Sequence, residues 1–210
     1  MMLKVAVLLF NYVEVLDFAG PFEVFSVTGK KEGKDLFDVY TVAETKTISA
    51  RGGLSINVHH TFTTCPLPDI LIVPGGGGFR SDGTPYGTRL ELHNDILLDF
   101  IVKCAQTCTK LLSVCTGSTL LAKRGLLDGK VSTTHHLSLN VLQELAPTSR
   151  VCADARVADN GRVVCSGGIS AGIDMCFYVI TQLHGAEETE RTAKYMEYNW
   201  QPDQLKVVKF

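Results

Sequence analysis

A cysteine stands where an apolar run meets a cluster of small residues, in the segment Ser113-Val-Cys-Thr-Gly-Ser118. The run Lys110–Val114 predicts a strand, and Gly117–Lys123 predicts a helix that follows it at once. A sharp strand-to-helix turn exposes the residue at its apex and requires small neighbours. At a helix N-terminus a thiol loses its proton more readily, and the thiolate is the reactive form. We therefore interpret Cys115 as a candidate nucleophile, with a buried core cysteine as the structural alternative.

An aspartate lies in the first expected strand-to-helix connection, within Leu16-Asp-Phe-Ala-Gly-Pro21. Pro21 is expected at the first helical position with Gly20 as the N-cap, which leaves Asp17 without an obvious structural role. A carboxyl group among apolar neighbours has a raised pKa and can exchange protons at neutral pH. The sequence leaves a proton-exchanging role and a structural role for Asp17 equally open.

Four consecutive glycines, Gly75 to Gly78, follow the apolar run Ile70–Val73. Successive glycines let backbone N–H groups approach a ligand closely, so this turn could hold a phosphate or a developing negative charge. The run lacks the G-x-G-x-x-G pattern of dinucleotide-binding folds, and Gly125–Val131 is not a phosphate-binding loop. We expect no organic cofactor.

Histidine and cysteine pairs elsewhere do not have the spacing of a metal site. The pairs are Cys104 with Cys108, His59 with His60, and His135 with His136. No C-x-x-C or H-E-x-x-H spacing supports them, so we expect no metal. The remaining cysteines are expected in the core, at Cys65, Cys152, Cys165 and Cys176. The segment Ser166–Gly172 is explained by close backbone packing alone.

Composition narrows the class of protein. The chain has 210 residues, 45% of them hydrophobic and 20% charged, and a net charge of −2. This balance argues against disorder and against nucleic-acid binding by phosphate neutralisation. No apolar stretch has the length of a membrane helix, and the opening Val5–Phe10 run is interpreted as a buried strand, not a signal peptide. Seven scattered cysteines are typical of a reducing compartment, so we expect a cytoplasmic protein without nucleic-acid or membrane partners.

Short β-branched runs alternate with longer helical patterns along the chain. The expected strands are Leu3–Phe10, Phe37–Val42, Leu54–Val58, Asp69–Val73, Lys110–Val114, Val151–Val157 and Val163–Cys165. The expected helices are Pro21–Val27, Leu90–Gln106, Gly117–Lys123, Leu137–Leu145, Ile173–Leu183 and Glu187–Tyr198. This alternation predicts one α/β domain over residues 1–210, a three-layer sandwich with a mainly parallel central sheet.

Ligands of such sheets bind beyond the carboxyl ends of the strands. The segments to inspect are therefore Asn11–Gly20, Pro74–Phe79, Cys115–Ser118 and Ser166–Gly172.

Taken together, these motifs resemble the ThiJ/PfpI superfamily, whose fold is flavodoxin-like and of the class I glutamine amidotransferase type. The resemblance rests on Leu16–Pro21, Val73–Gly76, Ser113–Ser118, Gly125–Gly129, Thr133–His135 and Ser166–Asp174. Within the superfamily it is similar to the branch of isonitrile hydratases and the ligand domains of AraC-type regulators. Since the chain ends before a DNA-binding domain could follow, we expect the stand-alone enzyme.

The resemblance also implies roles for individual residues. Cys115 matches the nucleophile and Asp17 the acidic residue beside it. Thr116 matches the hydratase pattern, because the protease-like branch usually has His at this position. The backbone N–H groups of Gly76 and Thr116 match an oxyanion-hole-like pocket. We also expect Gly75, Gly117 and His135 in the oxyanion and substrate-binding site, although the sequence does not place His135 in the pocket. The resemblance further implies a homodimer.

Three functions follow as hypotheses. The first is an isonitrile hydratase-like lyase, in which Cys115 attacks the isonitrile carbon and Asp17 transfers protons, acting on a small-molecule substrate. The second is a redox or electrophile sensor based on the same thiol, without turnover. The third is a small-ligand binding domain related to AraC-type regulators.

Overall fold

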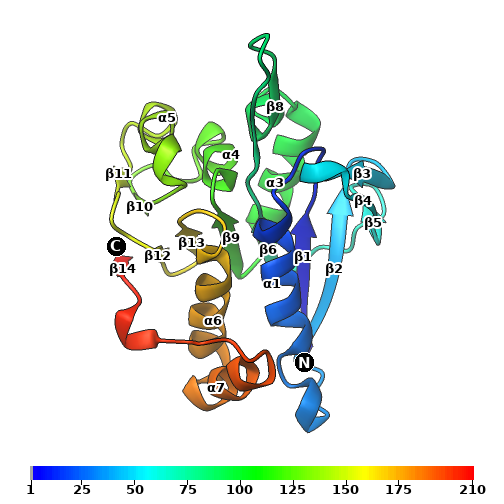
Figure 1. The fold of residues 1–210 in the computed structure, drawn as a ribbon, viewed down its shortest axis with the longest axis vertical. Coiled ribbons are helices and arrows are strands. Elements are labelled where there is room, and N and C mark those ends of the chain that lie inside the picture. The colour runs from blue at the N-terminus through cyan, green and yellow to red at the C-terminus, as the bar shows by residue number, and fades with distance from the viewer. Residues whose placement is uncertain (1) are drawn as a thin grey trace.

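The central sheet has eight strands. The structure, a computed structural model, describes residues 2–210. The strands of the sheet are β1 (Leu3–Leu8), β2 (Phe37–Ala43), β5 (His60–Thr61), β6 (Ile70–Val73), β9 (Lys110–Val114), β12 (Val157–Asn160), β13 (Val163–Ser166) and β14 (Val207–Lys209). Their order is β14-β12-β13-β9-β6-β1-β2-β5, and every pairing is parallel except β12 with β13 (Figure 1). The mainly parallel sheet predicted from the alternation is confirmed.

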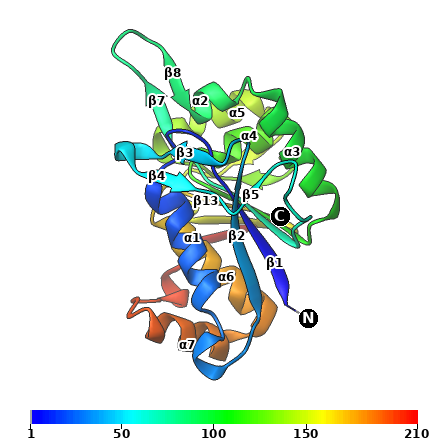
Figure 2. The same ribbon diagram turned by 90° about the vertical axis from the view of Figure 1, so that its right-hand side faces the viewer.

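Helices cover both faces of this sheet. They are α1 (Val15–Val27), α2 (Thr88–Glu91), α3 (Asp95–Thr107), α4 (Gly117–Lys123), α5 (Leu139–Leu145), α6 (Ala171–His184) and α7 (Ala186–Tyr195). Figure 2 shows α1, α6 and α7 on one side of the sheet and α3, α4 and α5 on the other. Three short two-stranded units flank the layers: β3 (Thr47–Ser49) with β4 (Ser55–Asn57), β7 (Gly77–Phe79) with β8 (Pro85–Gly87), and β10 (Val131–Ser132) with β11 (Arg150–Val151). The expected three-layer sandwich is confirmed.

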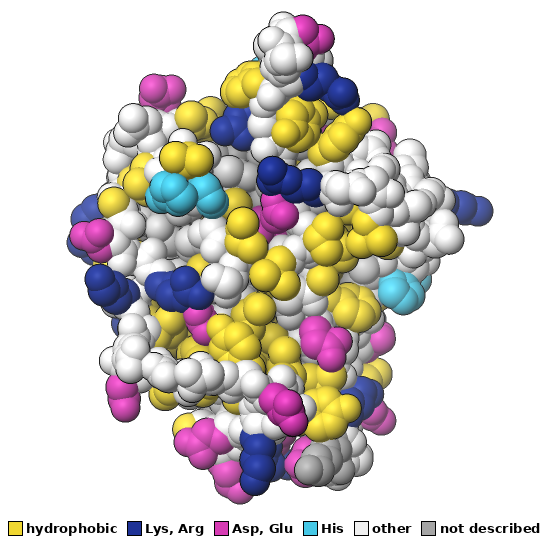
Figure 3. All heavy atoms as spheres, in the orientation of Figure 1, with side chains coloured by type: hydrophobic (Ala, Val, Ile, Leu, Met, Phe, Trp, Pro, Cys, Tyr) yellow, Lys and Arg dark blue, Asp and Glu magenta, His cyan; other side chains and the backbone are white. Residues whose placement is uncertain are grey.

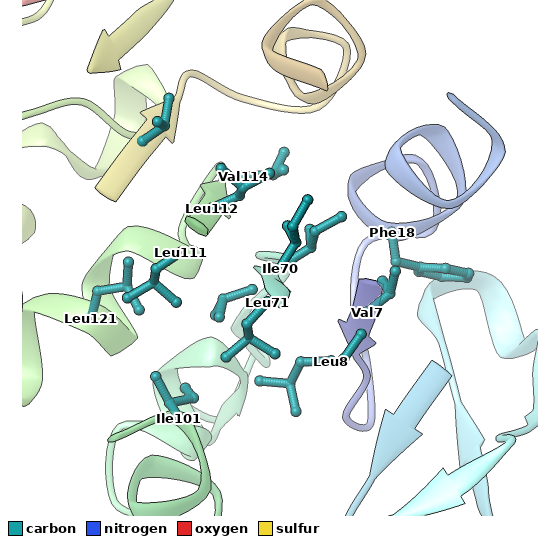
Figure 4. Close-up of a cluster of buried hydrophobic side chains, with 14 of the residues drawn as sticks. Val7, Leu8, Phe18, Ile70, Leu71, Ile101, Leu111, Leu112, Val114 and Leu121 are labelled. Carbon is teal, nitrogen blue, oxygen red and sulfur yellow. The ribbon is translucent and has the colours of Figure 1, made fainter. Parts of the chain in front are cut away.

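The core lies between the sheet and its helices. The central strands β1, β6 and β9 are fully apolar along most of their length because both of their faces are covered. Figure 4 shows Ile101 and Leu121 on one side of these strands and Phe18 on the other. The buried apolar side chains of these strands therefore fill two hydrophobic layers.

Five parallel strands run in the order β2-β1-β6-β9-β13, which is the 2-1-3-4-5 order of flavodoxin-like sheets. In this order the chain reverses direction across the sheet beside β1, and ligands bind outside the carboxyl ends at that point. The loops after β1, β6, β9 and β13 all reach this edge. It is the edge where the sequence places its candidate residues.

The start of the first helix differs from the prediction. Helix α1 begins at Val15, so Asp17 lies in its first turn and not in the preceding connection, and Gly20 is not the N-cap. Pro21 lies inside the helix. Gly20 instead permits close packing, since a Cβ there would lie 2.7 Å from Ile173 Cγ1 on α6. Burial of the helix against α6 outweighs the local preference of proline for a first turn.

Other boundaries differ where capping or long-range pairing decides them. The expected Leu90–Gln106 helix is two helices, because the Asn94 side chain accepts a bond from the Leu97 N–H and begins α3 anew. The Asn160-Gly161 hairpin is confirmed, but its first strand, β12, begins at Val157 where the predicted strand ends. The C-terminal tail, which the sequence leaves unassigned, supplies β14 beside β12.

The cysteine predictions are confirmed in part. All seven thiols are free. Cys165 and Cys176 are buried as expected, whereas Cys65 and Cys152 are only partly buried and do not belong to the inner core. Among residues 2–210 no helix combines the length and the apolar character needed to cross a bilayer.

Candidate active site around Cys115 and Asp17

Cys115 stands at the sharp turn between β9 and α4, as the sequence predicts. Its backbone has φ 57°, a left-handed conformation that costs a non-glycine residue on the order of 1 kcal/mol or more. Three hydrogen bonds hold this conformation: the Cys115 N–H donates to Gly167 O at 3.0 Å, and Cys115 O accepts from Thr134 Oγ1 at 2.8 Å and from Ser118 Oγ at 3.1 Å. The side chain is 5% exposed. The turn thus fixes the thiol before any ligand arrives.

The small residue two positions after the cysteine is required by a neighbouring loop. A Cβ on Gly117 would lie 2.1 Å from Val73 O and 2.8 Å from Pro74 O. Those atoms are backbone, so they cannot move aside without shifting the loop after β6. Gly117 therefore lets the two loops that build the site pack against each other, and it presents no group to a ligand.

Gly117→Ala is expected to lower the free energy of unfolding by about 2 kcal/mol or more, because the added methyl group overpacks the junction of two loops. Urea denaturation of the variant and the wild type measures the difference. Gly167→Ala is the matched control, since a Cβ there meets its nearest atom at 3.6 Å in ordinary contact. Equal stability of the two variants would contradict the packing role of Gly117.

Asp17 lies behind the cysteine and is sealed from solvent. Its side chain is 0% exposed, and its Oδ2 accepts a hydrogen bond from the Gly75 N–H at 3.0 Å. Its Oδ1 is buried without a hydrogen-bond partner among the described residues. Burial raises the pKa of Asp17 to about 7, although the Gly75 N–H acts in the opposite direction. The direction of this shift agrees with the raised pKa expected from the apolar neighbours of Asp17.

The thiol does not have the low pKa that its position suggests. Burial, and next the charge of Asp17, raise the pKa of Cys115 to about 12. The N–H groups of Thr116 and Ile169 act the other way, by less. The prediction of a thiolate stabilised by the helix N-terminus is therefore wrong, because desolvation and a neighbouring carboxylate outweigh the dipole of a seven-residue helix.

Asp17 and Cys115 titrate as a pair. Burial raises the pKa of both groups, and the loss of a second proton is disfavoured further because two negative charges would lie side by side. After the first proton has left, the pair holds one proton and one negative charge. A shift of that proton from sulfur to carboxylate produces a thiolate next to a carboxylic acid.

The first two N–H groups of the glycine run already have partners within the protein. The Gly75 N–H is engaged by Asp17, and the Gly76 N–H donates to Thr116 Oγ1 at 3.0 Å. A Cβ on Gly75 would lie 2.5 Å from Thr116 N and 2.9 Å from Asp17 Oδ2. Glycine is needed here so that the loop after β6 can approach both groups. Gly77 and Gly78 belong to strand β7.

A group that the sequence analysis missed takes the place of Gly76. Ile169 has φ 50°, and its backbone N–H interacts with both Cys115 and Asp17. The N–H groups of Thr116 and Ile169 act to lower the pKa of Cys115, whereas the Gly76 N–H donates to Thr116 Oγ1. The only signal was the glycine-rich segment Ser166–Gly172 directly after a strand, which close packing explained equally well.

The Cys115 side chain faces a cavity of about 310 Å³. The cavity is lined by Glu14, Arg51, Gly76, Gly77, Arg89, Cys115, Thr116, His135, Leu137, Ser138 and Ile169. Asp17 is not one of the lining residues, and its carboxyl group lies next to Cys115. Arg51 Nη1 and Glu14 Oε2 form an ion pair at 2.6 Å on the wall.

The fold brings His135 to this cavity wall, which the sequence leaves open. It packs against Gly168, where a Cβ would lie 2.3 Å from its Cδ2. Its Nδ1 accepts a hydrogen bond from the Leu137 N–H at 3.3 Å, which leaves the proton of the neutral ring on Nε2. Burial, and then the charge of His136, lower the pKa of His135. The ring is therefore neutral at pH 7.

No cluster of three or more histidine, cysteine or acidic side chains among residues 2–210 is arranged to hold a metal ion. The seven predicted site residues do meet in one place. Cys115, Thr116, Gly76 and His135 line the cavity, while Asp17, Gly75 and Gly117 lie directly behind its wall.

This chain is similar in sequence and in fold to several known proteins. The model of the DJ-1/PfpI family matches residues 3–182. The chain is 33% identical over 203 residues to isonitrile hydratase from Pseudomonas putida, covering 94% of this chain and 79% of that protein. It is 30% identical over 187 residues to the HTH-type transcriptional regulator GbdR from Pseudomonas aeruginosa, covering 88% of this chain but only 47% of the regulator. The crystal structure of a ThiJ/PfpI family protein from Pseudomonas syringae superposes with a TM-score of 0.81 at 25% identity, covering 96% of this chain and 77% of that one.

Proposed function

The chain belongs to the DJ-1/PfpI family, and we propose that within it this protein is an isonitrile hydratase, which adds water to R–N≡C to give an N-substituted formamide. The observation that carries the proposal is the Cys115 thiol on the wall of a cavity, with a buried carboxyl group of pKa about 7 directly behind it. The 33% identity to an isonitrile hydratase supports the choice of reaction. Such a pair supplies both a nucleophile and a proton.

In the first half of the reaction, the proton of the pair resides on Asp17 and Cys115 attacks as a thiolate. A bond forms between Sγ and the terminal isonitrile carbon, and Asp17 gives its proton to that carbon. The product is a thioimidate, R–N=CH–S, with Asp17 now a carboxylate. The N–H groups of Thr116 and Ile169 stabilise the negative charge while it is on sulfur.

In the second half, water adds to the thioimidate carbon. Asp17 takes a proton from the attacking water and delivers it to the substrate nitrogen, which gives R–NH–CH(OH)–S. Asp17 then removes the hydroxyl proton as the carbon–sulfur bond breaks. The formamide R–NH–CHO leaves, and the pair again holds one proton and one negative charge.

The proposal is tested by incubating the purified protein with n-butyl isonitrile and following N-butylformamide by gas chromatography. We expect formamide at a rate well above that of buffer alone. Rapid quenching followed by peptide mass spectrometry is expected to detect an adduct on the Cys115 peptide equal in mass to the intact isonitrile. Formamide formation at the background rate would rule the hydratase out.

A second candidate, a small-ligand binding domain without turnover, is favoured by the 30% identity to a transcriptional regulator over 88% of this chain. It predicts that an isonitrile or another small molecule raises the melting temperature of the protein while no formamide appears. The sensor hypothesis stays a prediction, and the raised pKa of Cys115 argues against ready oxidation at neutral pH.

A further inference from the structure

The cavity wall carries a positive charge that nothing in the described chain neutralises. Of the two arginines on the wall, Arg51 is paired with Glu14 at 2.6 Å. Arg89 has neither an ion pair nor a side-chain hydrogen bond among residues 2–210. Glu14 is the one acidic side chain on this wall, and it is already engaged. On the face of the molecule drawn in Figure 3, basic, acidic and histidine side chains lie close together in the upper half.

Arg89 is held in place by the elements around it. Its guanidinium carbon lies 5.1 Å from the centre of the Phe79 ring, a cation–π contact that restricts the side chain. The preceding residue ties α2 to the site, because the Thr88 N–H donates to Gly76 O at 3.0 Å and Thr88 Oγ1 lies 3.0 Å from Thr116 Oγ1. The arginine is therefore positioned relative to the cysteine turn without a ligand.

No other side chain among the described residues on the cavity wall carries an unbalanced positive charge. His135 is neutral, since burial lowers its pKa and the charges of His136 and Arg89 lower it further. The Arg51 charge is balanced by Glu14. One cation remains on the wall of the cavity, apart from the single negative charge of the Asp17–Cys115 pair.

We propose that the natural substrate is an isonitrile that carries a carboxylate, and that Arg89 is the residue that binds this carboxylate while the isonitrile carbon meets Cys115. This inference rests on the hydratase function proposed above. A planar guanidinium binds a carboxylate through two parallel hydrogen bonds, which gives orientation as well as affinity. A substrate anchored at both ends presents its reactive carbon to the sulfur in one orientation.

The test compares isocyanoacetate with isocyanoacetamide, which differ in charge and hardly in shape. The wild type is expected to have a kcat/KM at least about tenfold higher for the carboxylate, the size of one charge-assisted hydrogen bond. In Arg89→Gln this ratio is expected to fall below about threefold, mainly through a higher KM for isocyanoacetate. Arg80→Gln is the matched control. Arg80 also stacks on an aromatic ring, that of Tyr12, but does not line the cavity, so the ratio should keep its wild-type value.

A binding measurement separates this inference from the proposed function. N-formylglycine is the product expected from isocyanoacetate, and calorimetry detects its binding without turnover. Weaker binding of N-formylglycine to Arg89→Gln, with N-formylglycinamide as the neutral comparison, supports the anion site even if no isonitrile is hydrated. If both isonitriles are hydrated at equal kcat/KM, or if the ratio survives in Arg89→Gln, the carboxylate proposal is overturned and the hydratase stands.

Discussion

Cys115→Ala is expected to lower kcat/KM for isonitrile hydration by about 10⁴-fold or more, because Cys115 supplies the one thiol among the residues that line the cavity. The neutral imidazole of His135 also lines the cavity, but its nitrogen is a far weaker nucleophile toward the isonitrile carbon than a thiolate is. The measurement is the initial rate of formamide formation. The adduct on the Cys115 peptide should vanish in the same variant.

Cys152→Ala is the matched control for this loss. Cys152 is also a free, partly accessible thiol, but it lies outside the cavity lining. Its activity is expected to stay within about twofold of wild type, since surface substitutions away from a site have small effects. Residual turnover above one tenth of wild type in Cys115→Ala would show that the sulfur is not the nucleophile.

The cysteine turn could be predicted because its signals are local. An apolar strand, a small residue on each side and an immediate helix all lie within Lys110–Lys123, and φ 57° at Cys115 is what that pattern requires. The convergence of four loops followed from strand order alone, because parallel strands place their carboxyl ends at one edge. The structure accordingly joins Gly75 to Asp17 and Gly167 to Cys115 by hydrogen bonds.

Groups that act through long-range contacts could not be predicted. The N–H of Ile169 reaches the sulfur only because the loop after β13 turns back over the cysteine. The position of Arg89 depends on its stacking against Phe79 from the β7–β8 hairpin. The protonation of Cys115 was predicted wrongly for the same reason: a helix dipole can be inferred from neighbours in sequence, whereas desolvation depends on everything that packs around the thiol.

Asp17→Asn is expected to lower kcat/KM for isonitrile hydration by about 10²- to 10⁴-fold, since the amide cannot carry the proton between sulfur, carbon and nitrogen. The same variant should have a more acidic Cys115 thiol, because the charge of Asp17 raises the pKa of Cys115 in the wild type. The pH dependence of alkylation by iodoacetamide, followed on the Cys115 peptide by mass spectrometry, measures this pKa. If the Cys115 thiol of the variant ionises more easily while the variant hydrates isonitriles more slowly, the defect is the loss of the proton carrier and not the loss of the thiolate.

The substitution should also stabilise the fold at neutral pH. In the unfolded chain Asp17 loses its proton near pH 3.8, whereas in the folded protein it keeps it to about pH 7. Between these values the folded state binds more protons, so the free energy of unfolding falls as pH rises from about 4 to about 7. The rise in the pKa of Asp17 from 3.8 to about 7 corresponds to a loss of about 4 kcal/mol at most in the free energy of unfolding at high pH. The uncharged side chain of asparagine avoids this loss.

Urea denaturation at pH 4.5 and pH 8 tests this expectation. Asp17→Asn should lose less stability than wild type between the two pH values, while Asp38→Asn, on an exposed strand position, should follow the wild type. An unchanged pH dependence in Asp17→Asn would mean that the carboxyl group does not titrate near neutrality. A carboxylate that destabilises the fold and accelerates the reaction would explain why an acidic side chain with 0% exposure is kept next to Cys115 at a cost in stability.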